Sequence, residues 1–349
     1  MSHTNMPDPS GSKSLSAQNW VRILAKYRDP SHARSVFELA VSLLPFLALW
    51  ALAWWALSVS YALAIVLALV NSGFLVRLFI IQHDCGHGSF FRNRHASDWV
   101  GRILGVLTLT PYKVWRRSHS LHHASAGNLE KRGIGDVFTM TLAEYQAASR
   151  FERLKYRAYR NPLFLFGLAP VLLFLFQNRL PVGLMQSREY WVSAMGTNAM
   201  IALALGLIVW FGGVAPLLLV FVPTLVASAT IGMWLFYVQH QFEDTQWDHD
   251  PDWQMHESAL HGASYYVLPG ILRWFSGNIG VHHVHHLYSR IPFYRLMDVL
   301  RDHTVLQNIN RMTLRQSLAS ARLHLWDENS RKLVSFAQAR QRNTAPATP

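Results

Sequence analysis

The sequence predicts an all-α integral membrane protein, in which two transmembrane helical hairpins are joined to interfacial helices and to a helical cap on the cytosolic side. Two observations lead to this fold class. The stretches Leu39–Val76 and Tyr190–Phe242 contain no Asp, Glu, Lys or Arg, and the rest of the chain is strongly polar. Because one span needs only ~20 apolar residues, each stretch is long enough to cross a membrane twice.

Four spans are expected, at residues 36–59, 61–82, 191–211 and 214–238. The turns inside the two hairpins, at Ser58–Ser60 and Gly212–Gly213, carry no charge, whereas Lys and Arg occur beyond the other ends of the spans. Positively charged residues remain on the cytosolic side of a membrane. This distribution therefore predicts that the cap and both termini are cytosolic.

Two shorter apolar segments lie between the hairpins. Trp99–Thr110 contains Arg102, and Pro162–Phe176 would reach only ~22 Å as a helix, against a hydrocarbon core of ~30 Å. If Pro162–Phe176 crossed the membrane, the histidine-rich segments before and after it would face opposite sides. Both segments are therefore predicted to be interfacial or re-entrant helices.

The polar ends of the chain are expected to lie outside one membrane domain, which comprises residues 36–335. Residues 1–35 contain Pro, Gly and several Ser without a cleavable signal peptide, which favours a flexible cytosolic tail. Leu318–Phe336 is predicted to be a helix of the cap, and residues 336–349 a C-terminal tail. No internal repeat of fixed period is evident.

Composition narrows the possible partners. The net charge of +12 would suit nucleic acid, but no nucleic-acid-binding motif is present. The basic residues alternate with membrane segments, so anionic lipid and membrane orientation explain them better, with an acidic redox donor as a further possibility. Cys85 is the only cysteine, which excludes an intrachain disulfide. Its position between two histidines allows a thiolate ligand, but a small packed side chain is the favoured interpretation.

Three histidine clusters lie just cytosolic of the predicted spans. In a helix, residues at i, i+3 and i+4 point to one side, and this spacing occurs twice, with a looser i, i+4 pair upstream. Neutral imidazole binds iron, copper, zinc or nickel, and eight clustered imidazoles imply more than one metal. The cap is therefore predicted to hold a histidine-rich two-metal site. Its candidate ligands are His83, His87, His119, His122, His123, His282, His285 and His286.

Other polar residues beside these clusters have two interpretations each. His240, directly after the fourth span, is either a ninth ligand or an interfacial residue. Asn278 could orient a ligand or coordinate through water, and Asp84, Glu243 and Asp244 could accept ligand N–H groups or be ordinary surface charges. Histidines outside the cluster spacing are expected to support the fold or lie at the surface: His95, His249, His256, His261, His283 and His303.

These clusters resemble the three histidine boxes of membrane fatty acid desaturases: HDCGHGSF at 83–90, HSLHH at 119–123 and HHVHH at 282–286. The similarity extends over about residues 35–335. Further phrases resemble the bacterial acyl-lipid branch of that family, namely GDVFTMTLAEY (135–145), RLKYRAYRNP (153–162), FYVQHQFEDTQW (236–247) and GNIGVHHVHHLYSRIPFY (277–294).

The resemblance implies a reaction and a set of partners. Two iron ions, held by the eight boxed histidines and His240, would use O₂ and two external electrons to place a cis double bond in an acyl chain. A membrane lipid is favoured over acyl-CoA or acyl carrier protein as the substrate. The chain has neither a cytochrome b5 signature nor a cysteine cluster, so a separate ferredoxin-like or cytochrome-type donor is expected. The implied location is a bacterial inner membrane.

Other functions remain possible on the sequence alone. A related histidine-box hydroxylase or ketolase would share the same ligands. A membrane haem electron carrier would need histidine pairs on opposite sides of a haem, which the i, i+3, i+4 spacing does not supply. A metal transporter would need ionisable residues near the middle of the membrane, and the charge-free stretches contain none. A structural zinc site would close with four ligands and would normally recruit cysteine.

Overall fold

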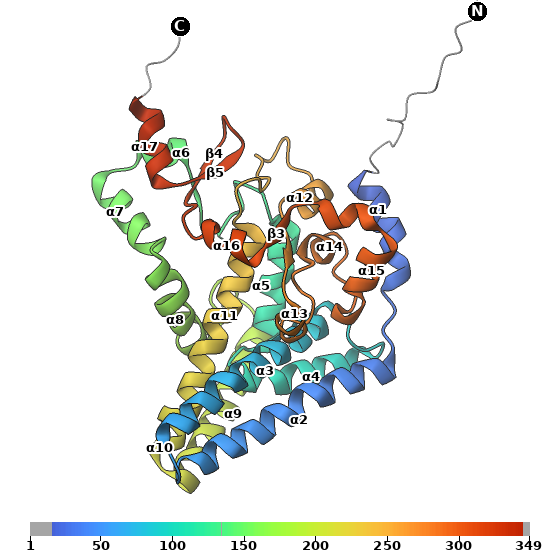
Figure 1. Cartoon of the computed structure of the whole chain (residues 1–349), viewed down its shortest axis with the longest axis vertical. Helices are drawn as coiled ribbons and strands as arrows, with labels where there is room; N and C mark the ends of the chain where they lie inside the picture. Colours follow the sequence, from blue (N-terminus) through green and yellow to red (C-terminus); the bar gives the residue numbers. More distant parts are fainter. Residues whose placement is uncertain (1–15, 134, 345–349) are drawn as a thin grey trace, which may run out of the picture.

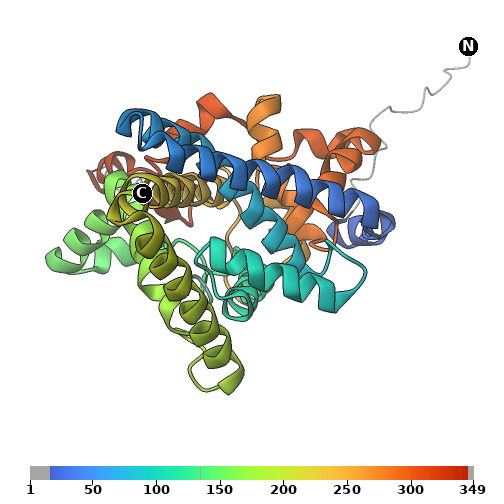
Figure 2. The same cartoon turned by 90° about the horizontal axis from the view of Figure 1, so that it is seen from below.

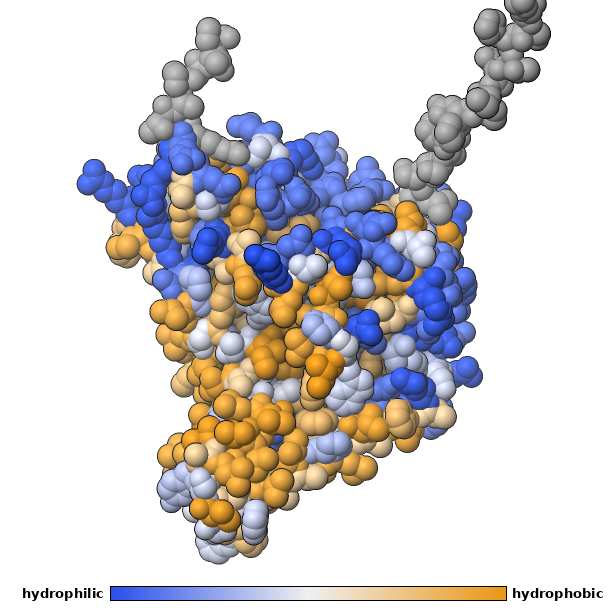
Figure 3. Space-filling model, in the orientation of Figure 1, coloured by the Kyte–Doolittle hydropathy of each residue, from blue (hydrophilic) through white to orange (hydrophobic). Residues whose placement is uncertain are grey.

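The computed structural model describes residues 16–133 and 135–344. Four helical segments in this part of the chain are long and apolar enough to cross a membrane, as the sequence predicts. They are α2 (His32–Ala56), α3 (Tyr61–His87), α9 (Arg188–Gly212), and a fourth that runs from α10 (Val214–Pro216) through the π-helical turn η4 (Leu217–Phe221) into α11 (Val222–His240). The lower part of the molecule presents an apolar surface and the upper part a polar one (Figure 3).

The first three spans differ in how closely they pack. Helices α2 and α3 lie side by side as an antiparallel hairpin (Figures 1 and 2). In contrast, α9 leans away from the others, buries only Ala194, and leaves its other side chains partly or fully exposed. An exposed apolar helix of this length is stable only when lipid covers it. The protein is therefore a membrane protein.

Two spans extend further into the cap than the sequence predicts. Helix α3 continues past Gln82 to His87, and α11 continues past Val238 to His240. Helix α3 ends where Gly88 adopts φ +68° and its N–H bonds the carbonyls of the preceding turn. Such a left-handed residue closes many helices and is usually glycine. The last turns of both spans thus carry histidine into the cap.

Helix α5 (Tyr112–Ser125) is fixed against the end of α3 by one aromatic residue. It follows α4 (Arg94–Leu107), on which a Cβ at Gly101 would come within 2.2 Å of the Tyr112 ring. The Tyr112 hydroxyl donates to the carbonyl oxygen of Cys85 at 2.9 Å. Cys85 itself is a buried, packed side chain, in agreement with the favoured interpretation. This packing brings the first two histidine boxes together.

The segment predicted to be interfacial or re-entrant at Pro162–Phe176 is helical. It contains the π-helical turn η2 (Leu163–Leu168) and α8 (Ala169–Leu175), follows α7 (Arg150–Tyr159) after a bend of 52°, and ends in the 3-10 turn η3 (Gln177–Arg179). The Thr230 hydroxyl of α11 donates to the Phe166 carbonyl at 2.9 Å. Arg179 donates to the carbonyl of Leu109, which precedes the second histidine box. This last contact favours a re-entrant path over a crossing, although by length and composition the bent pair could form a fifth span.

The cap is helical with two small sheets. Strand β1 (Met140–Thr141) is parallel to β4 (Leu325–Asp327), which pairs antiparallel with β5 (Lys332–Val334), and β2 (Tyr265–Val267) is parallel to β3 (Arg311–Thr313). The remaining elements of the cap are α6 (Leu142–Ala147), α12 (Met255–His261), α13 (Gly270–Phe275), α14 (His282–Leu287), η5 (Phe293–Arg295), α15 (Leu296–Asp302), η6 (Thr304–Asn308) and α16 (Leu314–Ser320).

The prediction of a helix over Leu318–Phe336 is wrong. Helix α16 ends at Ser320, and the chain then forms the β4–β5 hairpin. In the hairpin turn, the Asp327 carboxylate accepts a hydrogen bond from the backbone N–H of Asn329 and another from the Ser330 hydroxyl. Side chains of Asp, Asn and Ser stabilise turns in this way in preference to helix.

The two predicted tails are also ordered where the structure describes them. Helix α1 (Ala17–Leu24) and the 3-10 turn η1 (Ala25–Tyr27) pack on the core cluster of the cap, with Trp20 and Leu24 buried. The prediction of a flexible tail is therefore wrong for residues 16–35, and residues 1–15 lie outside the described part. At the other end, α17 (Phe336–Thr344) buries Ala339, and residues 345–349 lie outside the described part.

Removing the Trp20 side chain tests the docking of α1. Replacing a buried aromatic residue by alanine costs about 3–5 kcal/mol, so Trp20→Ala is expected to lower the thermal unfolding temperature of the detergent-solubilised protein. Gln18→Ala, on the exposed side of the same helix, is the matched control and should leave that temperature unchanged. Equal unfolding temperatures for the two variants would contradict docking of α1.

Candidate metal centre

The structure gathers all nine candidate histidines into two adjacent groups. Within each group, one nitrogen of every imidazole lies within 4.8 Å of one nitrogen of every other. The five-histidine group consists of His83, His87, His119, His123 and His285. The four-histidine group consists of His122, His240, His282 and His286.

Each of the two HxxHH boxes is divided between the groups. On α5, His119 and His123 belong to the five-histidine group, whereas His122 turns toward the other. On α14, His285 faces the five-histidine group, and its neighbours at 282 and 286 face the four-histidine group. Residues at i+3 and i+4 differ by about 100° around a helix axis, which is enough to separate them between two adjacent centres.

Hydrogen bonds fix α14 beside the end of α11. The amide nitrogen of Gln239 donates to the Ile279 carbonyl at 3.1 Å. Ser264 donates to the Gln239 carbonyl through its N–H, at 3.0 Å, and accepts through its own carbonyl from the N–H groups of His282 and His283, at 3.1 and 3.3 Å. The backbone around the third box is therefore held directly against the residue that precedes His240.

The spacing of the nitrogens fits a metal with more than four ligands. His119 Nε2 lies 3.0 Å from His87 Nε2 and 3.1 Å from His123 Nε2, and His240 Nε2 lies 3.1 and 3.0 Å from the Nε2 atoms of His122 and His282. With metal–nitrogen bonds of about 2.1 Å, two nitrogens 3.0 Å apart make an angle of about 90° at the metal. In a tetrahedral site with the same bonds, the nitrogens would be about 3.4 Å apart. The geometry fits five- or six-coordinate metal better than tetrahedral zinc.

The protonation state of the imidazoles also fits metal binding. Burial, reinforced by neighbouring imidazoles, holds the pKa of every boxed histidine on α5 and α14 well below its usual range: His119, His122, His123, His282, His285 and His286. These rings are therefore neutral near pH 7. One Nε2 atom cannot donate to two neighbouring nitrogens at once, so lone pairs of several imidazoles point toward the middle of each group. A metal cation in each group would accept these lone pairs.

The two groups differ in accessibility. All members of the four-histidine group are buried, but His87, His119 and His123 of the other group are half-buried. The Trp115 ring stacks on His119, with the ring centroids 4.7 Å apart. The Phe236 ring packs against His122 and His240, with the ring centroids 5.2 Å apart in each pair. These aromatic rings keep the imidazoles in place and limit the access of water.

Of the acidic residues considered from the sequence, only Asp84 contacts a candidate ligand. Its Oδ1 is 3.2 Å from His83 Nδ1, and its Oδ2 accepts a hydrogen bond from the Phe293 N–H at 2.7 Å. Asp84 thus orients an imidazole and ties the first box to the segment after the third. In contrast, Asp244 and Glu243 are exposed and pair with Lys332, so their predicted contact with the ligands is not formed.

Asn278 and His283 stabilise the fold around the third box. Asn278 lies in a turn with φ +55°, and its amide donates to the Phe293 carbonyl at 3.1 Å. His283 is fully buried and points away from both groups, with its Nε2 3.0 Å from the Leu306 carbonyl. Of the other histidines, His95 and His249 are exposed, and His256, His261 and His303 are partly so.

Two residues that support the histidine groups are not predicted from the sequence. Trp115 precedes His119 by one helical turn, so i, i+4 spacing could have identified it. Arg160 gave no local signal. Its buried guanidinium donates to the Tyr237 hydroxyl at 3.1 Å and to Gln241 Oε1 at 3.0 Å, beside His240. Only the fold brings it there.

A membrane-spanning helical fold that gathers nine imidazoles into two adjacent groups defines a class of membrane protein with a histidine-rich metal centre. Comparison with known proteins then gives the family. The fatty acid desaturase family matches residues 58–308, so the chain belongs to this family. The expectation of a membrane fatty acid desaturase, and hence of an oxidoreductase, is confirmed.

Individual relatives support the same assignment. A fatty acid desaturase of Bacillus subtilis (strain 168) is 43% identical over 313 residues, which cover 90% of this chain and 89% of the relative. An sn-1 acyl-lipid omega-3 desaturase (ferredoxin) of Synechocystis sp. is 29% identical over 63% of this chain and 61% of its own length. An sn-1 oleoyl-lipid 12-desaturase of the same organism is 26% identical over 64% and 63%, respectively.

The contact between Asp84 and His83 predicts a measurable effect on metal affinity. Replacing a carboxylate that orients a metal-bound histidine typically costs 10–100-fold in affinity, so Asp84→Asn should lower the metal content of the purified protein measurably. Asp244→Asn, the matched control, removes a carboxylate close to His240 in sequence but paired with Lys332. Elemental analysis should show unchanged metal in this control, and equal loss in both variants would refute the orienting contact.

Proposed function

We propose that the protein introduces a cis double bond into a lipid-linked acyl chain, using O₂ and two externally supplied electrons at two iron ions. The observation that carries this proposal is the pair of adjacent histidine groups at the ends of the spans. When bound, iron supplies the oxidising power to remove hydrogen from unactivated CH₂ groups, which no acid or base side chain can do. The nine histidines are proposed as its ligands, with His83, His87, His119, His123 and His285 at one ion and His122, His240, His282 and His286 at the other.

The chain's own residues would hold and shield this centre. The neutral imidazoles present lone pairs without any prior loss of a proton, and Asp84 fixes the orientation of His83. Trp115 and Phe236 cover the imidazoles and limit entry of water. The half-buried side, at His87 and His123, is the side through which an acyl chain and O₂ would approach.

A lipid-linked substrate is supported by both fold and relatives. The apolar spans leave the centre at the level where lipid head groups meet acyl chains, so a chain attached to a head group can reach it without leaving the bilayer. The Synechocystis relatives are named for acyl-lipid and oleoyl-lipid substrates. A haem carrier is disfavoured, because the rings of His87, His119 and His123 lie 4.6–4.9 Å from one another, centroid to centroid, and leave no gap for a planar porphyrin between them.

A separate electron donor of the ferredoxin type is proposed for this chain. The Synechocystis omega-3 desaturase is named for ferredoxin. Several basic residues of the cap are already paired within the fold: Arg116 with Asp98, Lys131 with Asp250 and Arg132 with Glu144. Arg117, which is exposed beside the second box, forms no ion pair within the described residues and is the better candidate for meeting an acidic donor.

Expression in a bacterial host tests the reaction directly. Fatty-acid methyl esters from cells with the active protein should contain a new product two mass units lighter than its saturated parent, and the purified protein should contain iron. His285→Ala should abolish the product and lower the iron content, because His285 Nε2 lies 3.1 Å from His123 Nε2 within the centre. His95→Ala removes an exposed histidine and should retain both. A product that has gained oxygen would favour hydroxylation instead.

The orientation in a bacterial inner membrane, with cytosolic termini, can be tested by cysteine labelling. On a Cys85→Ala background, Ser58→Cys should react with a membrane-impermeant reagent from the outside, because Ser58 lies in an exposed hairpin turn. Gln177→Cys and Asn329→Cys should react only after the cells are opened. Outside labelling at Gln177 would show that the segment around α8 crosses the membrane.

Donor docking predicts a dependence on salt. If the basic cap attracts an acidic ferredoxin, donor-supported turnover should fall as ionic strength rises, because screening slows electrostatically steered association. Arg117→Glu should weaken this dependence and raise the donor concentration needed for half-maximal rate. Arg301→Glu is a charge-matched control, since Arg301 is already paired with Asp298 and Asp302. Salt-independent turnover would remove the reason for an electrostatic docking face.

A further inference from the structure

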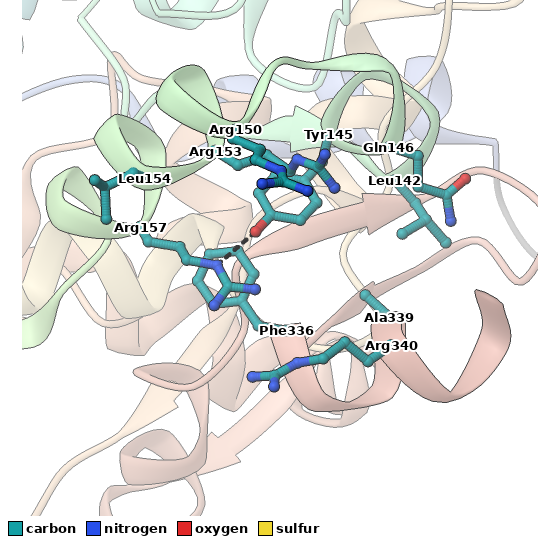
Figure 4. A pocket seen from close by; sticks show the side chains of 10 residues that line it. All are labelled: Leu142, Tyr145, Gln146, Arg150, Arg153, Leu154, Arg157, Phe336, Ala339 and Arg340. Carbon is teal, nitrogen blue, oxygen red and sulfur yellow. Dashed lines mark hydrogen bonds between the residues drawn. The ribbon is translucent and has the colours of Figure 1, made fainter. Parts of the chain in front are cut away.

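An arginine-lined hollow lies at the outer corner of the cap, away from the histidines. The hollow has a volume of about 370 Å³ and lies between α7 and α17 (Figure 4). Its floor is apolar and aromatic, and its walls carry guanidinium groups. The lining residues are Leu142, Tyr145, Gln146, Arg150, Arg153, Leu154, Arg157, Phe336, Ala339 and Arg340.

The hollow carries four positive charges and no lining carboxylate. Arg157 is held in place, since its Nε donates to the Tyr145 hydroxyl at 2.5 Å and its guanidinium lies 4.9 Å from the centroid of the Phe336 ring. Arg150 and Arg153 come from α7 and Arg340 from α17, on the other side of the floor (Figure 4). Within the described residues, none of these three forms an ion pair. Guanidinium groups that have no carboxylate partner and surround one hollow can bind an oxyanion such as phosphate.

The helix that supplies most of these cations is amphipathic in the manner of a membrane-surface helix. Arg150, Arg153 and Arg157 recur at i, i+3 and i+7 and form one stripe of α7. Phe151 and Leu154, which are 74% and 65% exposed, form the neighbouring stripe. Such a pairing of cations with uncovered apolar side chains is typical of helices at the boundary between head groups and acyl chains.

The segment that follows α7 in the chain is apolar and exposed. After Arg160, the chain bends and enters the apolar segment η2–α8, where Leu163 is 85% exposed. The single acidic residue of α7, Glu152, accepts the Ser149 N–H in a capping box and lies off the arginine stripe. The arginine-lined hollow lies at the opposite, N-terminal end of α7, where this helix faces α17 (Figure 1).

We propose that this hollow binds the phosphate of an anionic phospholipid, with the guanidinium groups around the phosphate and the acyl chains along Phe151 and Leu154. A lipid fits both stripes of α7, since it supplies the anion and covers the apolar side chains. An acidic protein would satisfy the charges but leave the apolar stripe exposed. The site is distinct from the metal centre, and its occupancy does not depend on the desaturation reaction.

Native mass spectrometry of the full-length protein from mixed micelles of dioleoyl phosphatidylglycerol and phosphatidylcholine tests the site. The wild-type chain should retain phosphatidylglycerol in preference to phosphatidylcholine. In the triple variant Arg150→Gln, Arg153→Gln and Arg340→Gln, the apparent affinity for phosphatidylglycerol should fall on the order of a hundredfold, as expected for the loss of three cations at a lipid surface. The matched control should retain the lipid, because it removes three exposed arginines elsewhere that form no ion pair in the described part of the chain: Arg92→Gln, Arg290→Gln and Arg315→Gln.

A second variant separates a lipid from other anions and does not depend on the arginine changes. Phe151→Gln, on the exposed apolar stripe, should weaken retention of phosphatidylglycerol while leaving binding of free glycerol phosphate unchanged. Equal retention of phosphatidylglycerol by the triple variant and its control would overturn the proposal. So would full displacement of the lipid by free glycerol phosphate. Loss of ferredoxin binding in the triple variant, with lipid retention intact, would assign the hollow to a protein partner instead.

Discussion

The structure depends on bringing nine imidazoles within a few ångströms of one another at the end of a membrane-spanning bundle. Four chain segments far apart in sequence supply these rings, so each segment has to be held by contacts of its own. Tyr112 fixes α5 to α3 through the Cys85 carbonyl, and Asp84 connects the first box to the backbone at Phe293. Ser264 joins the ends of α11 and α14. The clustered histidines thus require a hydrogen-bonded framework around them.

The features that the sequence predicts well are those with a local physical cause. Apolar length alone identifies the four spans, and i, i+3, i+4 spacing identifies the second and third boxes. The division of these two boxes between the two histidine groups could not be predicted. On α5, His122 and His123 differ by about 100° around the helix axis. Which group each ring joins depends on the positions of His240 and His285, which come from other helices.

The wrong predictions have two causes. The first is that closeness in sequence does not ensure closeness in space: Asp244 follows His240 by one helical turn in sequence, but α11 ends at His240 and the chain then leads the carboxylate to Lys332 at the surface. The second is that the average polarity of the N-terminal segment predicts a flexible tail. Its Ala17, Trp20 and Leu24 nevertheless share one face of a short helix and are buried against the cap. Short amphipathic helices are lost in a composition average.

The same limit applies to net charge, because arginines of one helix serve different purposes. At the C-terminal end of α7, Arg160 is buried and bonds Tyr237 and Gln241 beside His240. At the other end, Arg150 and Arg153 line the hollow and form no ion pair within the described residues. Net charge counts these arginines alike, although Arg160 is bonded within the fold and the other two remain available to an anion.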